Sequence, residues 1–252
     1  MTPVFLAFAN LWLLTRLVCL FRNEPAKGRT WLAKTAVELA ALAVLYPCNG
    51  VWLGIAASLL ALNLLGYRLE QGTARKDFSR LLLGVAGLAV WSVWFSPRLG
   101  LGFRPELATW TERLAQWTAL APLQKVLGGV RVQLVLFGLL LSANEANLVI
   151  RTVFDWLELK PRSLPAGGGA VDEGEFNRGR VIGMLERVLL YGFVLQAQYG
   201  AIGFVLAAKA FTRSKALDDR PFAEYVLIGT LLSACLALLT GGAVKWLLQA
   251  RG

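Results

Sequence analysis

The 252-residue sequence contains no histidine, few charged residues and only three cysteines. Without histidine, bis-histidine haem ligation, most zinc sites and histidine-based acid–base or nucleophilic catalysis are excluded. Cys19, Cys48 and Cys235 lie far apart and form no CxxC pair, so we expect no disulfide framework and no iron–sulfur cluster. No G-x-x-x-x-G-K-[ST] motif occurs, which argues against nucleotide hydrolysis. We therefore predict no cofactor and no metal.

Hydrophobic residues make up 56% of the chain and charged residues 17%, and the mean hydropathy is +0.56. A soluble domain is usually about 45–50% apolar and about 25% charged. The excess of apolar residues is too large for one globular core, so most of the chain is expected to face lipid. The runs are long rather than short and alternating, which favours helices over a β-barrel. The composition thus predicts an all-α, polytopic transmembrane helical bundle.

Eight hydrophobic segments follow one another along the chain. They cover residues 3–22, 31–46, 51–67, 80–95, 132–150, about 180–196, about 200–211 and 222–248. The stretch 180–213 has 34 residues, too many for one span, and Gln196, Gln198 and Gly200 mark its expected break. We interpret 1–252 as a single integral membrane domain, with four N-terminal segments in 1–97, an outer loop in 98–130 and a four-segment module in 131–252. Residues 160–177 are expected to form a cytoplasmic linker within that module.

Lysine and arginine alternate between the loops. The first, third, fifth and seventh connections contain them, whereas the second and sixth contain none. By the positive-inside rule, this alternation places the odd loops in the cytoplasm and both termini outside. The rule also explains the net charge of +10, so nucleic acid is not an expected partner.

The outer loop contains an amphipathic pattern. Leu107, Trp110, Leu114 and Trp117 recur at helical spacing after Pro105. Tryptophans on the apolar face of such a helix suit the lipid headgroup zone. The pattern predicts an extra interfacial helix, with docking on a partner protein as the alternative.

Ionisable and amide side chains enter the hydrophobic segments in one predicted layer. At 1.5 Å per residue, Glu145 lies about 9 Å from the cytoplasmic end of its segment, and the others have similar depths. The layer comprises Arg16, Lys34, Glu38, Asn63, Glu145, Glu186, Arg187, Lys209 and Glu224. Such residues are usually paired or functional. The layer is therefore a structural salt-bridge network, a polar cavity open to the cytoplasm, or a docking site for a partner subunit.

Spacing predicts several contacts within this layer. Lys34 and Glu38 are four residues apart and can pair on one helix. Asn144, Asn147 and Arg151 form a stripe on one face, suited to interhelical bonds or to a ligand. Glu186 and Arg187 point about 100° apart, so each needs a partner from another segment. We expect Lys209 for Glu186, and Glu145 or Glu224 for Arg187.

The C-terminal part contains NRGRVIGMLERVL from Asn177, then QYGAIGFVLAAKAFTR and FAEYVLIGTLLS. It resembles the C-terminal module of a family of uncharacterised bacterial multi-pass membrane proteins with G-x-L-E-R and A-E-Y-x-L-I-G-T patterns. The resemblance covers roughly a quarter of the chain and implies a bacterial inner-membrane protein. It directs attention to Arg180, Gly183, Glu186, Arg187, Lys209, Glu224, Tyr225 and Gly229. Beside it, Gly229, Ser233, Ala237 and Gly241 form a small-residue face that predicts a packing seam.

Three functional hypotheses follow. The first is a membrane protein that handles a small solute, an ion or a lipid at a cytoplasm-side polar site. The second is a non-catalytic membrane subunit or scaffold, and the third a membrane enzyme acting on a lipid-linked substrate. Expected partners are membrane lipid, and other membrane subunits or further copies of the chain. The candidate site residues are Asn144, Glu145, Asn147, Arg180, Glu186, Arg187, Lys209, Glu224 and Tyr225.

Overall fold

The computed structural model describes residues 2–19, 25–72, 75–107, 109, 113, 129–159, 173–212 and 220–250. These residues are helical apart from short turns, and no strand occurs among them. The all-α class is therefore confirmed for the described part of the chain. The chain divides into two compact units, Met1–Leu140 and Leu141–Gly252, called the first and second units below.

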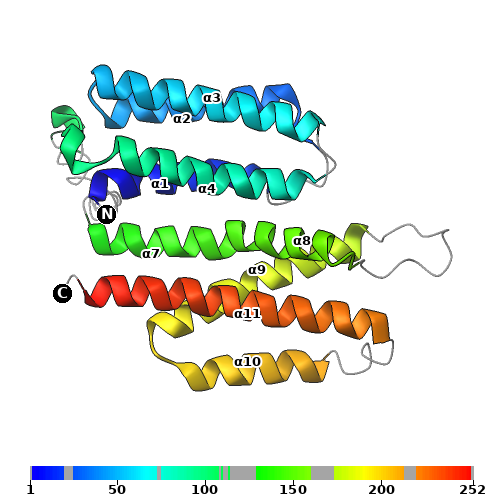
Figure 1. Cartoon of the computed structure of the whole chain (residues 1–252). Coiled ribbons are helices and arrows are strands. Elements are labelled where there is room, and N and C mark those ends of the chain that lie inside the picture. Colours follow the sequence, from blue (N-terminus) through cyan, green and yellow to red (C-terminus); the bar gives the residue numbers. More distant parts are fainter. Residues whose placement is uncertain are drawn as a thin grey trace. The chain divides into compact units, whose positions relative to one another are not determined.

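The described part of the first unit includes five α-helices of 11 residues or more. They are α1 (Pro3–Arg16), α2 (Gly28–Leu45), α3 (Gly50–Gly72), α4 (Lys76–Trp94) and α7 (Val130–Leu140), with 3-10 turns η1 (Leu17–Cys19) and η2 (Pro97–Leu99). Helix α2 packs against α3, α3 against α4, and α1 against α7 (Figure 1). The core between α1, α2 and α4 is aromatic: the ring centroid of Phe8 lies 5.2 Å from that of Trp91 and 5.1 Å from that of Phe95.

The second unit begins inside a continuous helix. After α7 come a π-helical segment, η3 (Leu141–Glu145), and α8 (Ala146–Trp156), followed by α9 (Glu173–Leu195), α10 (Tyr199–Thr212) and α11 (Arg220–Gln249). Helix α11 packs along α9, and η3 lies against both of them. Leu190, Val194, Ile202, Ala234 and Ala237 form the buried core of this unit.

Local sequence signals explain several helix ends. Helix α1 begins with Pro3, and the Thr2 hydroxyl accepts a hydrogen bond from the Phe5 amide at 3.2 Å, a normal N-cap. In the turn after α2, Asn49 Oδ1 accepts a hydrogen bond from the Trp52 amide at 2.9 Å. Side-chain acceptors at these positions satisfy amide groups that have no partner within the helix.

The predicted break near Gln196 separates α9 from α10. Ala197 has a positive φ of 57°, and the Gln198 amide donates to the Phe193 carbonyl at 2.8 Å. A residue in the left-handed backbone conformation just after a helix turns the chain, so that the following amides can donate to the last carbonyls of the helix. The long hydrophobic stretch is therefore two helices, as its length predicts.

Four helices of the described part are long and apolar enough to cross a membrane. They are Gly50–Gly72, Lys76–Trp94, Val130–Trp156 and Ala223–Gln249. Helices α1 and α10 are apolar but have only 14 residues each. Helix α2 has Arg29, Lys34 and Glu38 within its 18 residues, and α9 also has several charges. The count of eight crossings stays a prediction.

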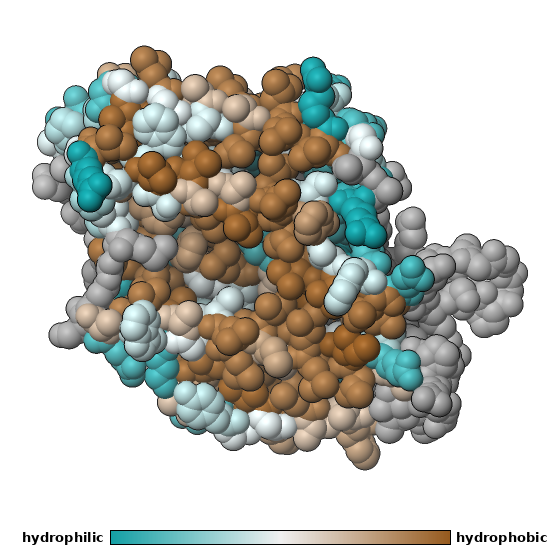
Figure 2. Space-filling model, in the orientation of Figure 1, coloured by the Kyte–Doolittle hydropathy of each residue, from teal (hydrophilic) through white to brown (hydrophobic). Residues whose placement is uncertain are grey.

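Large hydrophobic side chains face outward on both units. Leu32 is 72% exposed and Leu53 64% in the first unit, and Phe204 is 75% and Phe211 82% exposed in the second. Figure 2 shows hydrophobic residues over the middle of the helices and hydrophilic residues gathered near helix ends. This distribution is the reverse of a water-facing surface and suits helices in contact with lipid.

Several predicted boundaries differ from the structure, and three of them have a local explanation. Helix α3 continues to Gly72 rather than Tyr67, because contacts of Glu70 described below hold its last turns. Helix α4 begins at Lys76 rather than Arg80, with Asp77 in the first turn, where a negative charge is favourable. Helix α9 begins at Glu173, inside the predicted linker 160–177, since a polar sequence at a helix start does not prevent helix formation.

The predicted interfacial helix falls mostly outside the described residues. Residues 105–107 are helical, and the Leu107 amide donates to the Arg104 carbonyl at 3.0 Å. Trp110, Leu114 and Trp117 lie outside the described residues. The remaining linker residues, 160–172, also lie outside them.

Candidate functional site

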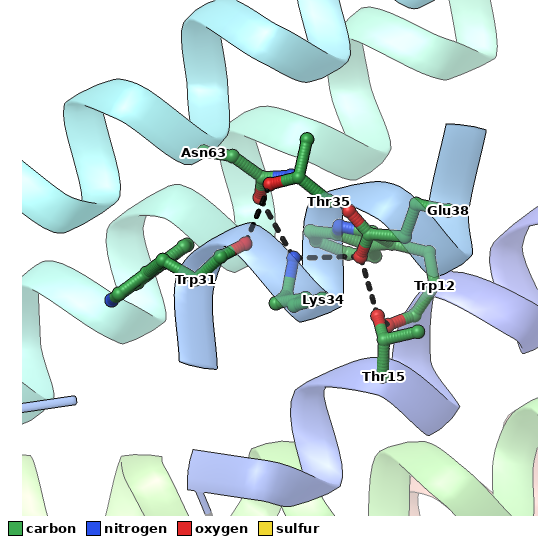
Figure 3. A network of polar contacts seen from close by, with 7 residues as sticks. All are labelled: Trp12, Thr15, Trp31, Lys34, Thr35, Glu38 and Asn63. Atoms are coloured by element: carbon green, nitrogen blue, oxygen red, sulfur yellow. Dashed lines mark hydrogen bonds and ion pairs between the residues drawn. The ribbon is translucent and has the colours of Figure 1, made fainter. Parts of the chain in front are cut away.

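A carboxylate at the centre of the first unit is surrounded by donors. Glu38 is fully buried, and its Oε1 accepts from Lys34 Nζ at 2.6 Å and from the Thr15 hydroxyl at 2.5 Å. Its Oε2 accepts from Asn63 Nδ2 at 2.7 Å (Figure 3). The side chains come from α1, α2 and α3, so this one group joins three helices.

Asn63 completes the same network. Its Oδ1 accepts from Lys34 Nζ at 2.7 Å, and its Nδ2 also donates to the Thr35 hydroxyl at 3.0 Å (Figure 3). Thr35 in turn donates to the Trp31 carbonyl at 2.8 Å. The carboxylate, the amide and the ammonium group thus all find partners among themselves. The predicted pairing of Lys34 with Glu38 is confirmed, and it is part of a larger network.

A second carboxylate network lies at the α3–α4 connection. Glu70 is 1% exposed and accepts from Arg80 Nε at 2.8 Å and from the Ala26 amide at 2.9 Å. Arg80 also pairs with Asp77 at 3.4 Å, and Arg16 Nη2 donates to the Arg80 carbonyl at 2.8 Å. These bonds tie α1, α3 and α4 to the chain just before α2.

Sequence reasoning missed Thr15, Glu70 and Asp77. Arg80 was not part of the predicted polar layer, yet it is 3% exposed. The available signal was the presence of two acidic residues, Glu70 and Asp77, in a connection otherwise rich in lysine and arginine. An acidic group among cations is a candidate for a buried ion pair.

In the second unit, an arginine binds the π-helical segment. Arg187 of α9 is 2% exposed, and its Nε donates to the Ser142 carbonyl at 2.9 Å and its Nη2 to the Ala143 carbonyl at 3.4 Å. Its Nη1 donates to the Ser233 hydroxyl of α11 at 3.3 Å. A π segment disturbs the regular helical bonding, and single-turn π segments are frequent at functional sites. Arg187 therefore holds η3 in place between α9 and α11.

Polar side chains of η3 and α8 are buried without complete hydrogen bonding. Ser142 and Asn144 are fully buried, and Asn147 is 7% exposed. Among the described residues, Ser142 Oγ, Asn144 Oδ1 and Asn147 Nδ2 have no hydrogen-bond partner. Asn144 and Asn147 share one helix face, whereas Ser142, two residues before Asn144, points to another side; we call the three residues together the polar stripe. An unsatisfied buried polar group costs about 1–3 kcal/mol, so each of the three needs an explanation.

The remaining candidate residues lie around this segment. Glu145 accepts from Asn144 Nδ2 at 3.0 Å. The predicted pairing of Glu186 with Lys209 is confirmed by a salt bridge that joins α9 to α10. Arg180 is buried, Glu224 is exposed, and the ring of Tyr225 lies 4.6 Å from that of Phe154.

The structure therefore divides the predicted site between two faces of α9. Arg187 faces η3 and α11, whereas Glu186 faces α10. The expected partner of Arg187 was Glu145 or Glu224, but its hydrogen bonds go to two carbonyls and a hydroxyl instead. The prediction failed because sequence reasoning could not foresee that η3 would offer carbonyls to a nearby arginine. Ser142 was missed, although it opens a run with four polar residues in six, Ser142 to Asn147.

The predicted packing seam on α11 is present. A Cβ at Gly229 would lie 2.7 Å from Phe154 Cζ, and a Cβ at Gly241 would lie 2.9 Å from Val194 Cβ. Ala237 is fully buried. The small-residue face thus allows α8 and α9 to approach α11 closely, as small residues do between membrane helices.

No group of three or more histidine, cysteine, aspartate or glutamate side chains in the described part of the chain is placed to hold a metal ion. Comparison with protein-family models, curated proteins and solved structures finds no match for this chain. The resemblance of the C-terminal part to a bacterial membrane family therefore stays a prediction. The function proposed below therefore rests on the geometry of the buried polar side chains.

Proposed function

We propose that the chain is an integral membrane protein that binds a small polar solute at the polar stripe of its second unit. The observation that carries this proposal is that three of the eight buried polar atoms without a hydrogen-bond partner among the described residues lie within six residues, on Ser142, Asn144 and Asn147. Buried polar groups in apolar helices are costly, and a ligand that completes their hydrogen bonds explains why they are there.

Three further features support a binding role. The stripe begins in a π-helical segment, where the regular bonding of the helix is interrupted. Arg187 satisfies the carbonyls of Ser142 and Ala143, so the irregular backbone is held without using the side chains of the stripe. Asn144 and Asn147 are three residues apart and share one helix face.

A cysteine accessibility experiment tests the proposal. In the full chain with its native cysteines replaced by serine, Asn147→Cys in liposomes should react with a water-soluble methanethiosulfonate reagent. Leu148→Cys is the matched control, because Leu148 is the next residue and is 1% exposed on an apolar face. Reaction at 147 and not at 148 supports solute access. Equal protection of both positions would contradict the proposal.

We further propose that all eight hydrophobic segments cross or enter a bacterial inner membrane, with both termini outside. The alternation of basic loops and the resemblance of the C-terminal part support this topology. Reporter fusions after Lys76, Ala115, Ala170 and Ala216 should then read inside, outside, inside and inside. A cytoplasmic reading at Ala115 would overturn the orientation.

A further inference from the structure

A cavity lies in the first unit where α1, α4 and α7 meet. Its volume is about 540 Å³, within the range of about 300–1,000 Å³ that is usual for ligand pockets in proteins. Among the residues that line it, Phe5 lies on α1, Leu88 on α4 and Phe137 on α7. Helix α1 packs against both α4 and α7, so three helices of one unit bound the cavity.

Buried phenyl rings form part of the wall of this cavity. Phe5, Phe95 and Phe137 are buried and line it, and the ring centroids of Phe5 and Phe95 lie 6.1 Å apart. Among the described residues that line the cavity, none is charged. Apolar cavities exclude water and take up apolar molecules. The wall therefore favours a hydrocarbon over an ion or a polar solute.

The hydroxyl groups that line the cavity already have backbone partners. Thr2 Oγ1 caps the first turn of α1, and Ser92 Oγ donates to the Ala89 carbonyl at 2.7 Å. Ser96 Oγ accepts from the Arg98 amide at 3.4 Å. Thr2 and Ser96 lie just outside the ends of α1 and α4, so these two hydroxyls mark the end of the cavity that is nearest to the helix termini.

The other end of the cavity lies within the apolar part of the helices. Helix α4 is long and apolar enough to cross a membrane and ends at Trp94. Leu88 is seven residues before Phe95, hence about 10 Å deeper along the helix. Phe137 lies at a similar depth from the start of the candidate span Val130–Trp156. In a membrane, helix ends lie near the headgroups, so the cavity extends from that level into the hydrocarbon region.

One side of the cavity opens at the outer surface of α4. Ala89 and Ser92 line the cavity and are both exposed. On the same helix, Val85 is 61% and Val93 66% exposed, so this surface suits contact with lipid. A lipid chain can therefore enter the cavity from the side without passing through the protein.

We propose that this cavity binds one hydrocarbon chain of a membrane phospholipid. The chain end lies near Leu88 and Phe137, and the ester end lies near Thr2 and Ser96. An empty cavity would deprive its walls of van der Waals contacts, and a lipid chain supplies them where lipid surrounds the helices. This site is separate from the polar stripe of the second unit, and the proposal does not depend on solute binding there.

The test uses phosphatidylglycerol with a photoactivatable diazirine near the end of one acyl chain. The full chain is irradiated in nanodiscs that contain a small fraction of this lipid, and the modified residues are located by mass spectrometry. Surrounding lipid reaches Leu53 of α3, which is 64% exposed, so this residue serves as the reference. We expect labelling of Phe137 as well, although it is buried. A diazirine near the ester group should label Ser96 and not Phe137.

Two variants fill the cavity, and a third is their matched control. Ser92→Phe places a ring at an exposed lining position and should abolish the labelling of Phe137 while leaving that of Leu53 unchanged. Ala89→Phe, one turn away on the same wall, should have the same effect. Val93→Phe introduces the same ring next to Ser92, at an exposed residue that does not line the cavity, and should keep the labelling.

Each outcome decides the proposal. Labelling of Phe137 that both cavity-filling variants remove and that Val93→Phe keeps supports it. If Leu53 is labelled in the wild type and Phe137 is not, the cavity is closed to lipid or filled by protein, and the proposal is overturned. Labelling of Phe137 that persists in both cavity-filling variants overturns it, because lipid then reaches Phe137 by another route. Labelling of Phe137 by a water-soluble diazirine also overturns it, because the cavity then holds water.

Discussion

Two buried asparagines, one in each unit, show opposite hydrogen bonding. Asn63 is 7% exposed, and its oxygen and nitrogen bond to Lys34, Thr35 and Glu38. Asn144 is fully buried, yet its oxygen has no partner among the described residues. Since burial alone is similar, it does not distinguish a structural amide from a binding one. The completeness of the hydrogen bonding is what sets Asn144 apart from Asn63, and the proposed binding role rests on that difference.

The buried ionic groups of the two units show the same difference in hydrogen bonding. Glu38 and Glu70 in the first unit are each held by several donors from different helices. Such closed networks fix helix packing, and removing one member strands the others. In the second unit, Arg187 supports the backbone of η3 while the side chains of the stripe stay open. Glu38 and Glu70 thus have structural contacts, whereas the open side chains of the second unit are the basis of the proposed binding site.

The largest expected effect is the loss of the closed network. Glu38→Ala strands the Lys34 ammonium, which is 7% exposed, and should lower the free energy of unfolding by about 3–5 kcal/mol. Denaturant unfolding in mixed micelles measures it, with Glu106→Ala at an exposed position as the control. The double variant Lys34→Met with Glu38→Leu should recover much of the loss. A loss below about 1 kcal/mol for Glu38→Ala would mean that the network is not structural.

A smaller effect is expected at the α11 seam. Gly241→Ala places a Cβ 2.9 Å from Val194 Cβ and should cost about 1–3 kcal/mol through overpacking. The adjacent Gly242 has nothing within 4 Å of its Cβ position. Gly242→Ala should therefore be neutral or stabilise the helix by about 0.5–1 kcal/mol. Thermal unfolding of both variants checks the difference, and equal effects would argue against the seam.

The smallest effect concerns the salt bridge on the other face of α9. Glu186 and Lys209 have side-chain exposures of 17% and 15%, so water screens the pair in part. Glu186→Gln should lower stability by about 1 kcal/mol or less. Adding Lys209→Gln should restore most of it, and unfolding curves of the three variants measure the coupling. If the double variant is less stable than Glu186→Gln, the pair is not the relevant interaction.

Much of the fold could be predicted from sequence because hydrophobic runs and turn residues are local signals. All eight predicted segments are helical where described, and the break near Gln196 is correct. Pairs set by spacing, such as Lys34 with Glu38, were also predictable. The contacts of Glu70 and Arg187 were not, because each depends on backbone groups that tertiary packing brings near. The π segment that supplies the carbonyls for Arg187 has no hydrophobic pattern that marks it.

The account is tested most directly by the stabilities of Asn63→Leu and Asn144→Leu in lipid nanodiscs. Leucine is close to asparagine in size and removes all of its polar atoms at both sites. In the first unit it removes hydrogen bonds to Lys34, Thr35 and Glu38, at a cost of about 1.5–3 kcal/mol for each of the two charged partners. In the second unit it removes an unpartnered oxygen and a single bond to one charged group, Glu145, so the loss should be about half as large. A loss for Asn63→Leu that is at least about twice the loss for Asn144→Leu is the predicted result. Equal large losses at both positions would contradict the claim that the polar stripe is kept for a ligand and not for the fold.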